Sequence, residues 1–135
     1  MRRLIILAAA LAGCSTELLL PGPGQPGDVR SVRLFDGAGV DQTQHLFIFR
    51  NDTLHLEIRM YAANGRRITD VPGGVELTLE FVPAGLATST ATLAPLIRSV
   101  TTTAAANDTG TMNVSLRFPV DGSVKTFGPF ECATH

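Results

Sequence analysis

Three histidines and the acids near them are the side chains in this sequence that could bind a transition metal. His55 and Glu57 are two positions apart in a segment that alternates apolar and polar residues, so both would lie on the polar face of one strand. If strands at 45–50 and 53–61 pair as a hairpin, His45 falls on the opposite face from His55. A zinc site normally needs three or four ligands. We therefore expect no dedicated metal site and keep His45, His55 and Glu57 as the weak candidates.

The remaining reactive residues favour structural roles. Cys132 alternates with Phe130 in a final apolar segment, which favours a buried thiol, with an intermolecular disulfide as the alternative. His135 stands at the end of the printed chain and is expected to be frayed. Glu76 and Glu80 share one strand face but lie about 13 Å apart at about 3.3 Å per residue, too far for a glycosidase pair.

Other groups of polar residues also lack the spacing of a catalytic site. Asp36, Asp41 and Asp52 are expected to border loops at one end of the domain, without the spacing of a calcium loop. Met60 and Met112 fall at apolar positions of their strands, which indicates core packing rather than copper binding. The sequence contains no nucleophile elbow, zinc-protease motif, P-loop or dinucleotide fingerprint. We therefore expect a protein that is not an enzyme, with no catalytic residues and no cofactor.

The overall charge argues against nucleic acid as a partner. The chain has 11 basic and 12 acidic residues, so there is no basic surplus to neutralise phosphates. It has no Trp and one Tyr, which leaves little for stacking on bases or sugars.

The N-terminal residues have the order of a secretory signal. Arg2 and Arg3 give a short positive start, residues 4–11 (LIILAAAL) are apolar, and the run is too short to span a bilayer. Its last residue, Leu11, begins the sequence Leu11-Ala12-Gly13-Cys14. This segment resembles the lipobox of bacterial lipoproteins at all four positions.

The resemblance implies a lipid anchor. Residues 1–13 would be a signal peptide cleaved after Gly13, and Cys14 would carry a thioether-linked diacylglycerol as the new N-terminus. Two or three acyl chains hold a protein stably on a membrane. In similar lipoproteins an Asp after the Cys favours the inner membrane, so Ser15 favours the outer membrane of the bacterial cell envelope.

Residues 14–30 are expected to be a tether between the anchor and the domain at 31–135. The stretch Pro21–Gly27 alternates Pro and Gly, which suits neither a helix nor a sheet. The sixteen residues 15–30 would reach at most about 50 Å at about 3.1 Å per extended residue. Leu18–Leu20 would either enter the lipid interface or cover an edge of the domain.

Residues 31–135 alternate with a period of two, which is typical of strands with one buried and one solvated face. Three strong strands are predicted at 53–61, 75–81 and 111–118, and weaker ones at 29–35, 45–50, 66–69, 97–103 and 124–132. The predicted core positions are Leu56, Ile58, Leu77, Leu79, Val114 and Leu116.

This pattern predicts an all-β, antiparallel sandwich of about seven or eight strands, with a small closed barrel as the alternative. The architecture resembles the immunoglobulin-like sandwiches of bacterial surface and periplasmic proteins, although the Cys-Trp-Cys core of antibody domains is missing. Phe127-Gly128-Pro129-Phe130 is predicted to form a bulge or an edge that resists pairing, rather than a peptide-docking edge.

These observations predict a lipid-anchored envelope protein that acts as a non-enzymatic interaction or structural module. The protein would contact the membrane through the lipid at Cys14, and the sequence does not identify a protein partner. The alternative is a periplasmic or surface protein that binds a metal or a small ligand through His45, His55 and the loop acids.

Overall fold

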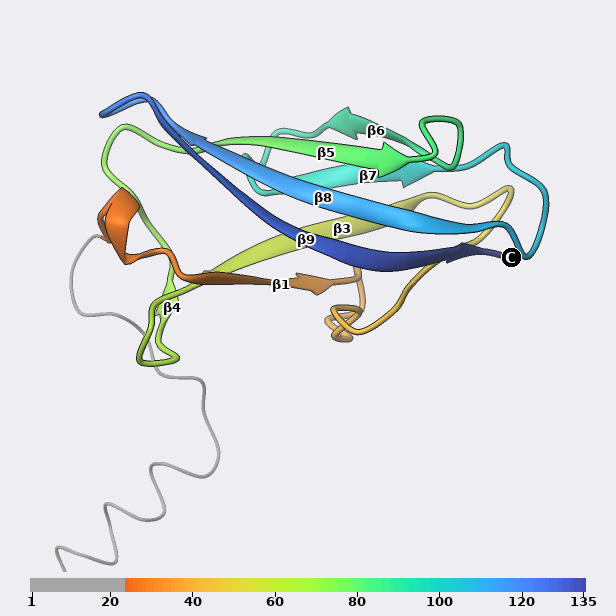
Figure 1. Ribbon diagram of the computed structural model, residues 1–135, viewed down its shortest axis with the longest axis horizontal. Helices are drawn as coiled ribbons and strands as arrows, with labels where there is room; N and C mark the ends of the chain where they lie inside the picture. The colour runs from red at the N-terminus through yellow and green to blue at the C-terminus, as the bar shows by residue number, and fades with distance from the viewer. Residues whose placement is uncertain (1–23) are drawn as a thin grey trace, which may run out of the picture.

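The computed structural model describes residues 24–135, and the predictions for the signal segment and Cys14 lie outside the described residues. Within this range the chain forms one short 3-10 helix and nine strands (Figure 1). Their bounds are η1 Pro26–Asp28, β1 Ser31–Phe35, β2 Leu46–Ile48, β3 Leu54–Tyr61, β4 Arg67–Ile68, β5 Glu76–Val82, β6 Thr88–Ala91, β7 Ile97–Thr101, β8 Thr109–Phe118 and β9 Ser123–Thr134.

The strands form two sheets that face each other. One sheet has the order β1-β3-β7-β6 with β4 paired to β3, and the other has the order β2-β9-β8-β5. All strand pairs are antiparallel except β2 with β9, which is parallel. The predicted all-β sandwich of the immunoglobulin-like type is therefore confirmed.

The core lies between the two sheets and follows the predicted alternation. Leu56 and Ile58 of β3 are buried against the inward residues of β5 and β8. All six predicted core residues are buried: Leu56, Ile58, Leu77, Leu79, Val114 and Leu116. Met60 and Met112 are also buried in this core, as their positions predicted.

Two strand predictions differ from the structure. β6 was not predicted, because its sequence Thr-Ser-Thr-Ala has no apolar alternation and its edge position leaves most of it exposed. The expected hairpin between 45–50 and 53–61 is wrong. β2 pairs with β9, and β3 pairs with strands of the other sheet, so the turn at 49–53 carries the chain from one sheet to the other.

Residues 24–30 differ from the expected tether because they pack onto the sandwich. The Gly24 N–H donates to the Asp70 carbonyl oxygen at 2.8 Å, and Val29 is 1% exposed. The Lys125 ammonium donates to the Val29 carbonyl oxygen at 2.8 Å, which ties this segment to the second sheet. A Cβ at Gly24 would collide with the Ile68 side chain, so the chain passes this point only because the residue is glycine.

The predicted irregularity in the last strand is confirmed as a bulge. The β8·β9 register changes between Met112, which faces Phe130, and Val114, which faces Phe127. Gly128 has φ 120 and precedes Pro129, which cannot donate a backbone hydrogen bond.

The described chain begins and ends at opposite ends of the sandwich (Figure 1). We call the end with η1 and the β8–β9 turn the entry end, because residue 24 begins there. The opposite end holds the C-terminus and the loop between β7 and β8. The Asn107 N–H donates to the Thr134 carbonyl oxygen at 2.7 Å, which joins that loop to the end of β9.

Candidate functional site: a groove beside His55

A groove of about 450 Å³ lies where the β1–β2 loop, β2 and the start of β3 meet. We call it the His55 groove. It is lined by Asp36, Gly37, Ala38, Gln42, Phe47, Phe49, Asp52, Thr53, Leu54 and His55. β1 ends opposite Glu57, so the first residues of β3 have no β1 neighbour and this side of the strand is open. The volume falls in the range of small-ligand and side-chain pockets.

One carboxylate organises the loop that forms a wall of the groove. Asp36 Oδ1 accepts the backbone N–H of Ala38 and of Val40, both at 2.9 Å, and Oδ2 accepts the Gln42 amide at 3.1 Å. These hydrogen bonds, the one from Val40 above all, lower the pKa of Asp36 below its usual value. The loop wall is therefore held by an ionised carboxylate.

Phe47 and Phe49 form the other wall and belong to a cluster of rings. The ring of Phe47 lies 4.5 Å from that of His45 and 5.0 Å from that of His135, measured between centroids. Phe49 lies 5.5 Å from His135. Phe47 is 39% exposed and Phe49 56% exposed, although both are large apolar side chains. We call His45, Phe47, Phe49 and His135 the ring cluster.

The structure separates His45 from the other two metal candidates, His55 and Glu57. His45 Nδ1 lies 3.7 Å from a carboxylate oxygen of Glu131, on the outward side of β2 and β9. His55 and Glu57 share the outer face of β3, as predicted, and both line a smaller hollow of about 200 Å³ that also includes Asp36. His45 and His55 therefore lie apart because β2 and β3 belong to different sheets, and not because they occupy opposite faces of one hairpin.

The carboxylates beside His55 are already engaged. Glu57 Oε1 accepts the Arg59 Nε–H at 2.7 Å, and Arg67 lies 3.6 Å from Glu57 Oε2. Asp36 is held by its own loop. Across residues 24–135, His, Cys, Asp and Glu side chains form no group of three that could hold a metal ion.

The two C-terminal residues of interest behave differently from each other. Cys132 is 1% exposed, and burial raises the pKa of its thiol to about 11, so the interpretation as a buried apolar residue is confirmed. The expected frayed His135 is wrong. Its N–H donates to the Ile48 carbonyl oxygen at 3.0 Å, and its carbonyl oxygen accepts the Arg50 N–H at 2.7 Å.

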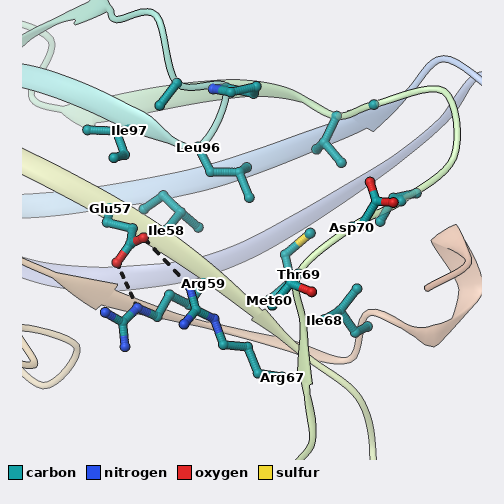
Figure 2. A pocket seen from close by; sticks show the side chains of 15 residues that line it. Glu57, Ile58, Arg59, Met60, Arg67, Ile68, Thr69, Asp70, Leu96 and Ile97 are labelled. Carbon is teal, nitrogen blue, oxygen red and sulfur yellow. Dashed lines mark hydrogen bonds and ion pairs between the residues drawn. The ribbon is translucent and has the colours of Figure 1, made fainter. Parts of the chain in front are cut away.

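A second hollow, of about 270 Å³, opens where β3 changes partner from β7 to β4 (Figure 2). The Ile58 N–H there donates to the Leu96 carbonyl oxygen at 2.9 Å. Figure 2 shows Glu57 at the rim between Arg59 and Arg67, while Ile58 and Leu96 form part of the apolar lining. The rim cations are paired with Glu57, so this hollow offers an apolar space with a largely neutralised edge.

Sequence reasoning identified part of the groove and missed its ring wall. Asp36, Asp41 and Asp52 lie in the loops between β1, β2 and β3, as expected, and of these Asp36 and Asp52 line the groove. Phe47 and Phe49 were not singled out. In 45–50 both alternating sets contain apolar residues, so the pattern did not show which set faces outward. The useful signal was that a strand apolar on both sides must leave one set exposed in a two-layer sandwich, where each sheet buries only its inner face.

Comparisons with known proteins give no assignment. No family model, no curated protein and no solved structure matches this chain.

Among residues 24–135, no helix is long and apolar enough to cross a membrane.

Proposed function

We propose that this chain is a lipid-anchored, non-enzymatic interaction module of a bacterial cell envelope, held in the outer membrane rather than the inner one. Leu11-Ala12-Gly13-Cys14 supports the anchor and Ser15 supports the outer membrane. After cleavage, the loss of Arg2 and Arg3 leaves 9 basic and 12 acidic residues, so the domain itself has no attraction to anionic lipid.

The observation that carries the proposal is the placement of two features at opposite ends of the sandwich. The chain enters at the η1 end, which is the end nearest Cys14 in sequence (Figure 1). The His55 groove and the ring cluster lie at the end that holds the C-terminus. A module anchored at one end leaves the other free to meet a partner.

An interaction role is favoured over metal binding because the candidate ligand carboxylates are already bound by other groups of the protein. Glu57 is engaged by Arg59 and Arg67, and Asp36 by backbone N–H groups. Exposed aromatic side chains beside a groove are typical of protein interfaces, whose buried centres are enriched in such residues.

The anchor is tested by expressing the full chain in a bacterial host and comparing it with the Cys14→Ala variant. We expect the parent chain in the outer-membrane fraction, with mass spectrometry showing a diacylglycerol thioether on Cys14. The variant should be unprocessed or released. A free Cys14 thiol, or a mature chain that begins elsewhere, would contradict the anchor.

The interaction role is tested in the same cells by placing a photo-crosslinking residue at Phe49. The matched control places it at Val124, which is exposed on the first part of β9 near the entry end. We expect a discrete crosslinked adduct from the groove position and none from the control. Equal labelling from both positions would contradict an interaction surface at the groove.

A further inference from the structure

The charges that line the His55 groove are predominantly negative. Asp36 and Asp52 are the charged residues of its main hollow. In the adjoining hollow Glu57 forms a 2.7 Å ion pair with Arg59 and lies 3.6 Å from Arg67, so its negative charge is already balanced by arginine. The groove therefore carries the charge of two carboxylates without a matching cation in its lining.

The surroundings of the groove extend the same sign. Among the charged residues around the groove, Asp41, Asp108 and Glu131 are acidic and Arg50 is basic, while Arg33 and Arg59 act electrostatically on Asp41. Together with Asp36, Asp52, Glu57 and Arg67, this region has six acidic residues against four arginines. Asp41 lies in the loop that Asp36 organises, and Asp108 and Glu131 lie beside the end of β9. A cation approaching this end meets a favourable field, whereas an anionic lipid surface or nucleic acid is repelled.

The aromatic wall favours the same kind of occupant. The face of a Phe ring carries a partial negative charge and attracts an ammonium or guanidinium group within about 6 Å. Phe47 contacts His45 edge-to-face and His135 at a tilt while staying 39% exposed, so its ring is oriented before any partner arrives. The opposite wall is fixed by the hydrogen bonds of Asp36. A preformed groove avoids part of the ordering cost of binding.

We propose that the His55 groove binds an extended, arginine- or lysine-rich segment of a protein partner. One cationic side chain enters the hollow between Phe47 and Asp52, and the charge of Asp36, whose oxygens are held by its own loop, adds to the attraction from the opposite wall. The stem of that side chain packs on the exposed rings, and its neighbours along the segment face the acidic rim. This inference rests on the proposed function, because it names the partner chemistry of the same interaction surface.

The test measures binding of a fluorescein-labelled decapeptide of alternating Arg and Ser to the full chain in neutral detergent micelles, at low salt. We expect saturable binding that weakens as salt is added and that is absent for the same peptide with Glu in place of Arg. Asp52→Asn keeps an oxygen that can accept the Thr53 N–H and removes the charge, and we expect it to weaken binding about tenfold.

A steric variant separates the groove from general attraction between opposite charges. Gly37 lines the groove, has no left-handed backbone, and its Cβ would meet only the His55 Cβ, at an ordinary 3.6 Å. Gly37→Leu should therefore fill the groove without changing charge and abolish most of the binding. Gly27→Leu is the matched control, because it has open space around it and lies in η1 at the entry end.

Thermal unfolding of each variant confirms that the fold is retained. Lack of saturable binding to the Arg peptide, or equal binding by Gly37→Leu and Gly27→Leu, overturns the inference. A chain that is lipidated at Cys14 and crosslinks from Phe49 but does not bind the peptide keeps the proposed function and loses only this partner chemistry. A chain that has a free Cys14 thiol but still binds the peptide keeps this partner chemistry and loses the lipid anchor of the proposed function.

Discussion

At the scale of single residues, Asp36 has the most consequences for the groove. Asp36 lies in the β1–β2 loop, which passes from one sheet to the other and has few strand partners for its backbone. Its carboxylate takes their place by accepting hydrogen bonds from two backbone N–H groups and one side-chain amide. A neutral carboxylic acid accepts such bonds more weakly than a carboxylate. The shape of the loop wall therefore depends on the charge of one side chain.

This dependence predicts an acid-sensitive contribution to folding. Because the pKa of Asp36 is lower in the folded chain than its usual 3.8, its contribution is present above the unfolded pKa and is lost as the pH falls through the folded value. We expect Asp36→Asn to be less stable than the parent near neutral pH and the difference to shrink below about pH 3.8. Chemical unfolding across this range measures it. A difference that is constant with pH would contradict the role of the charge.

At the scale of elements, alternation determines which face of a strand is buried but not which strand lies beside it. The inward residues of β3, β5 and β8 follow directly from their sequences. The pairing partner of β2 does not follow from the local sequence. β2 pairs in parallel with β9, and Leu46 lies beside Cys132, which is far from it in sequence. Asn51 has φ 62, as a hairpin turn would require, but the chain crosses to the other sheet there, so this local turn does not determine the strand pairing.

The same limit explains why the groove could be predicted only in part. His55 and Glu57 share a face because they are two residues apart on one strand, which the sequence states directly. The meeting of Phe47 with His135 depends on the long-range pairing of β2 with the end of β9. The packing of residues 24–30 likewise depends on Lys125 and Asp70, which are distant in sequence.

The inner and outer faces of β5 and β8 predict different costs for substitutions on each face. Leu116 is 0% exposed and faces Leu77 across the strand pair, whereas Thr78 lies on the outer face. We expect Leu116→Ala to lower the free energy of unfolding by about 2–5 kcal/mol through lost burial and a residual cavity. Thr78→Ala should change it by less than about 0.5 kcal/mol. Denaturant titration of both variants measures this, and equal costs would contradict the assignment of faces.

At the scale of the whole molecule, the position of Gly24 determines which end of the sandwich lies nearer to the proposed lipid anchor. Gly24 is fixed against Ile68 and Asp70 at the entry end, ten residues after Cys14. Those ten residues reach about 35 Å when fully extended. β9 has 12 residues and spans about 40 Å at about 3.3 Å per residue, so the groove end lies farther from Gly24 than the proposed lipid anchor at Cys14 can lie. The acidic groove end also gains nothing from contact with anionic lipid.

An upright domain should therefore bring its entry end closer to the membrane than its groove end. We would attach a fluorophore to Val120→Cys, in the β8–β9 turn, or to Ala106→Cys, in the β7–β8 loop, both of which are exposed. Cys132 is buried with a raised pKa, so it should not compete for the label. In vesicles that contain the lipidated chain and a quencher in the lipid headgroups, we expect stronger quenching at Val120 than at Ala106. Adding salt should not reverse this order, because the order follows from where the tether joins the sandwich. Equal quenching at the two sites would mean that the domain lies on its side, and the groove would then not face away from the membrane.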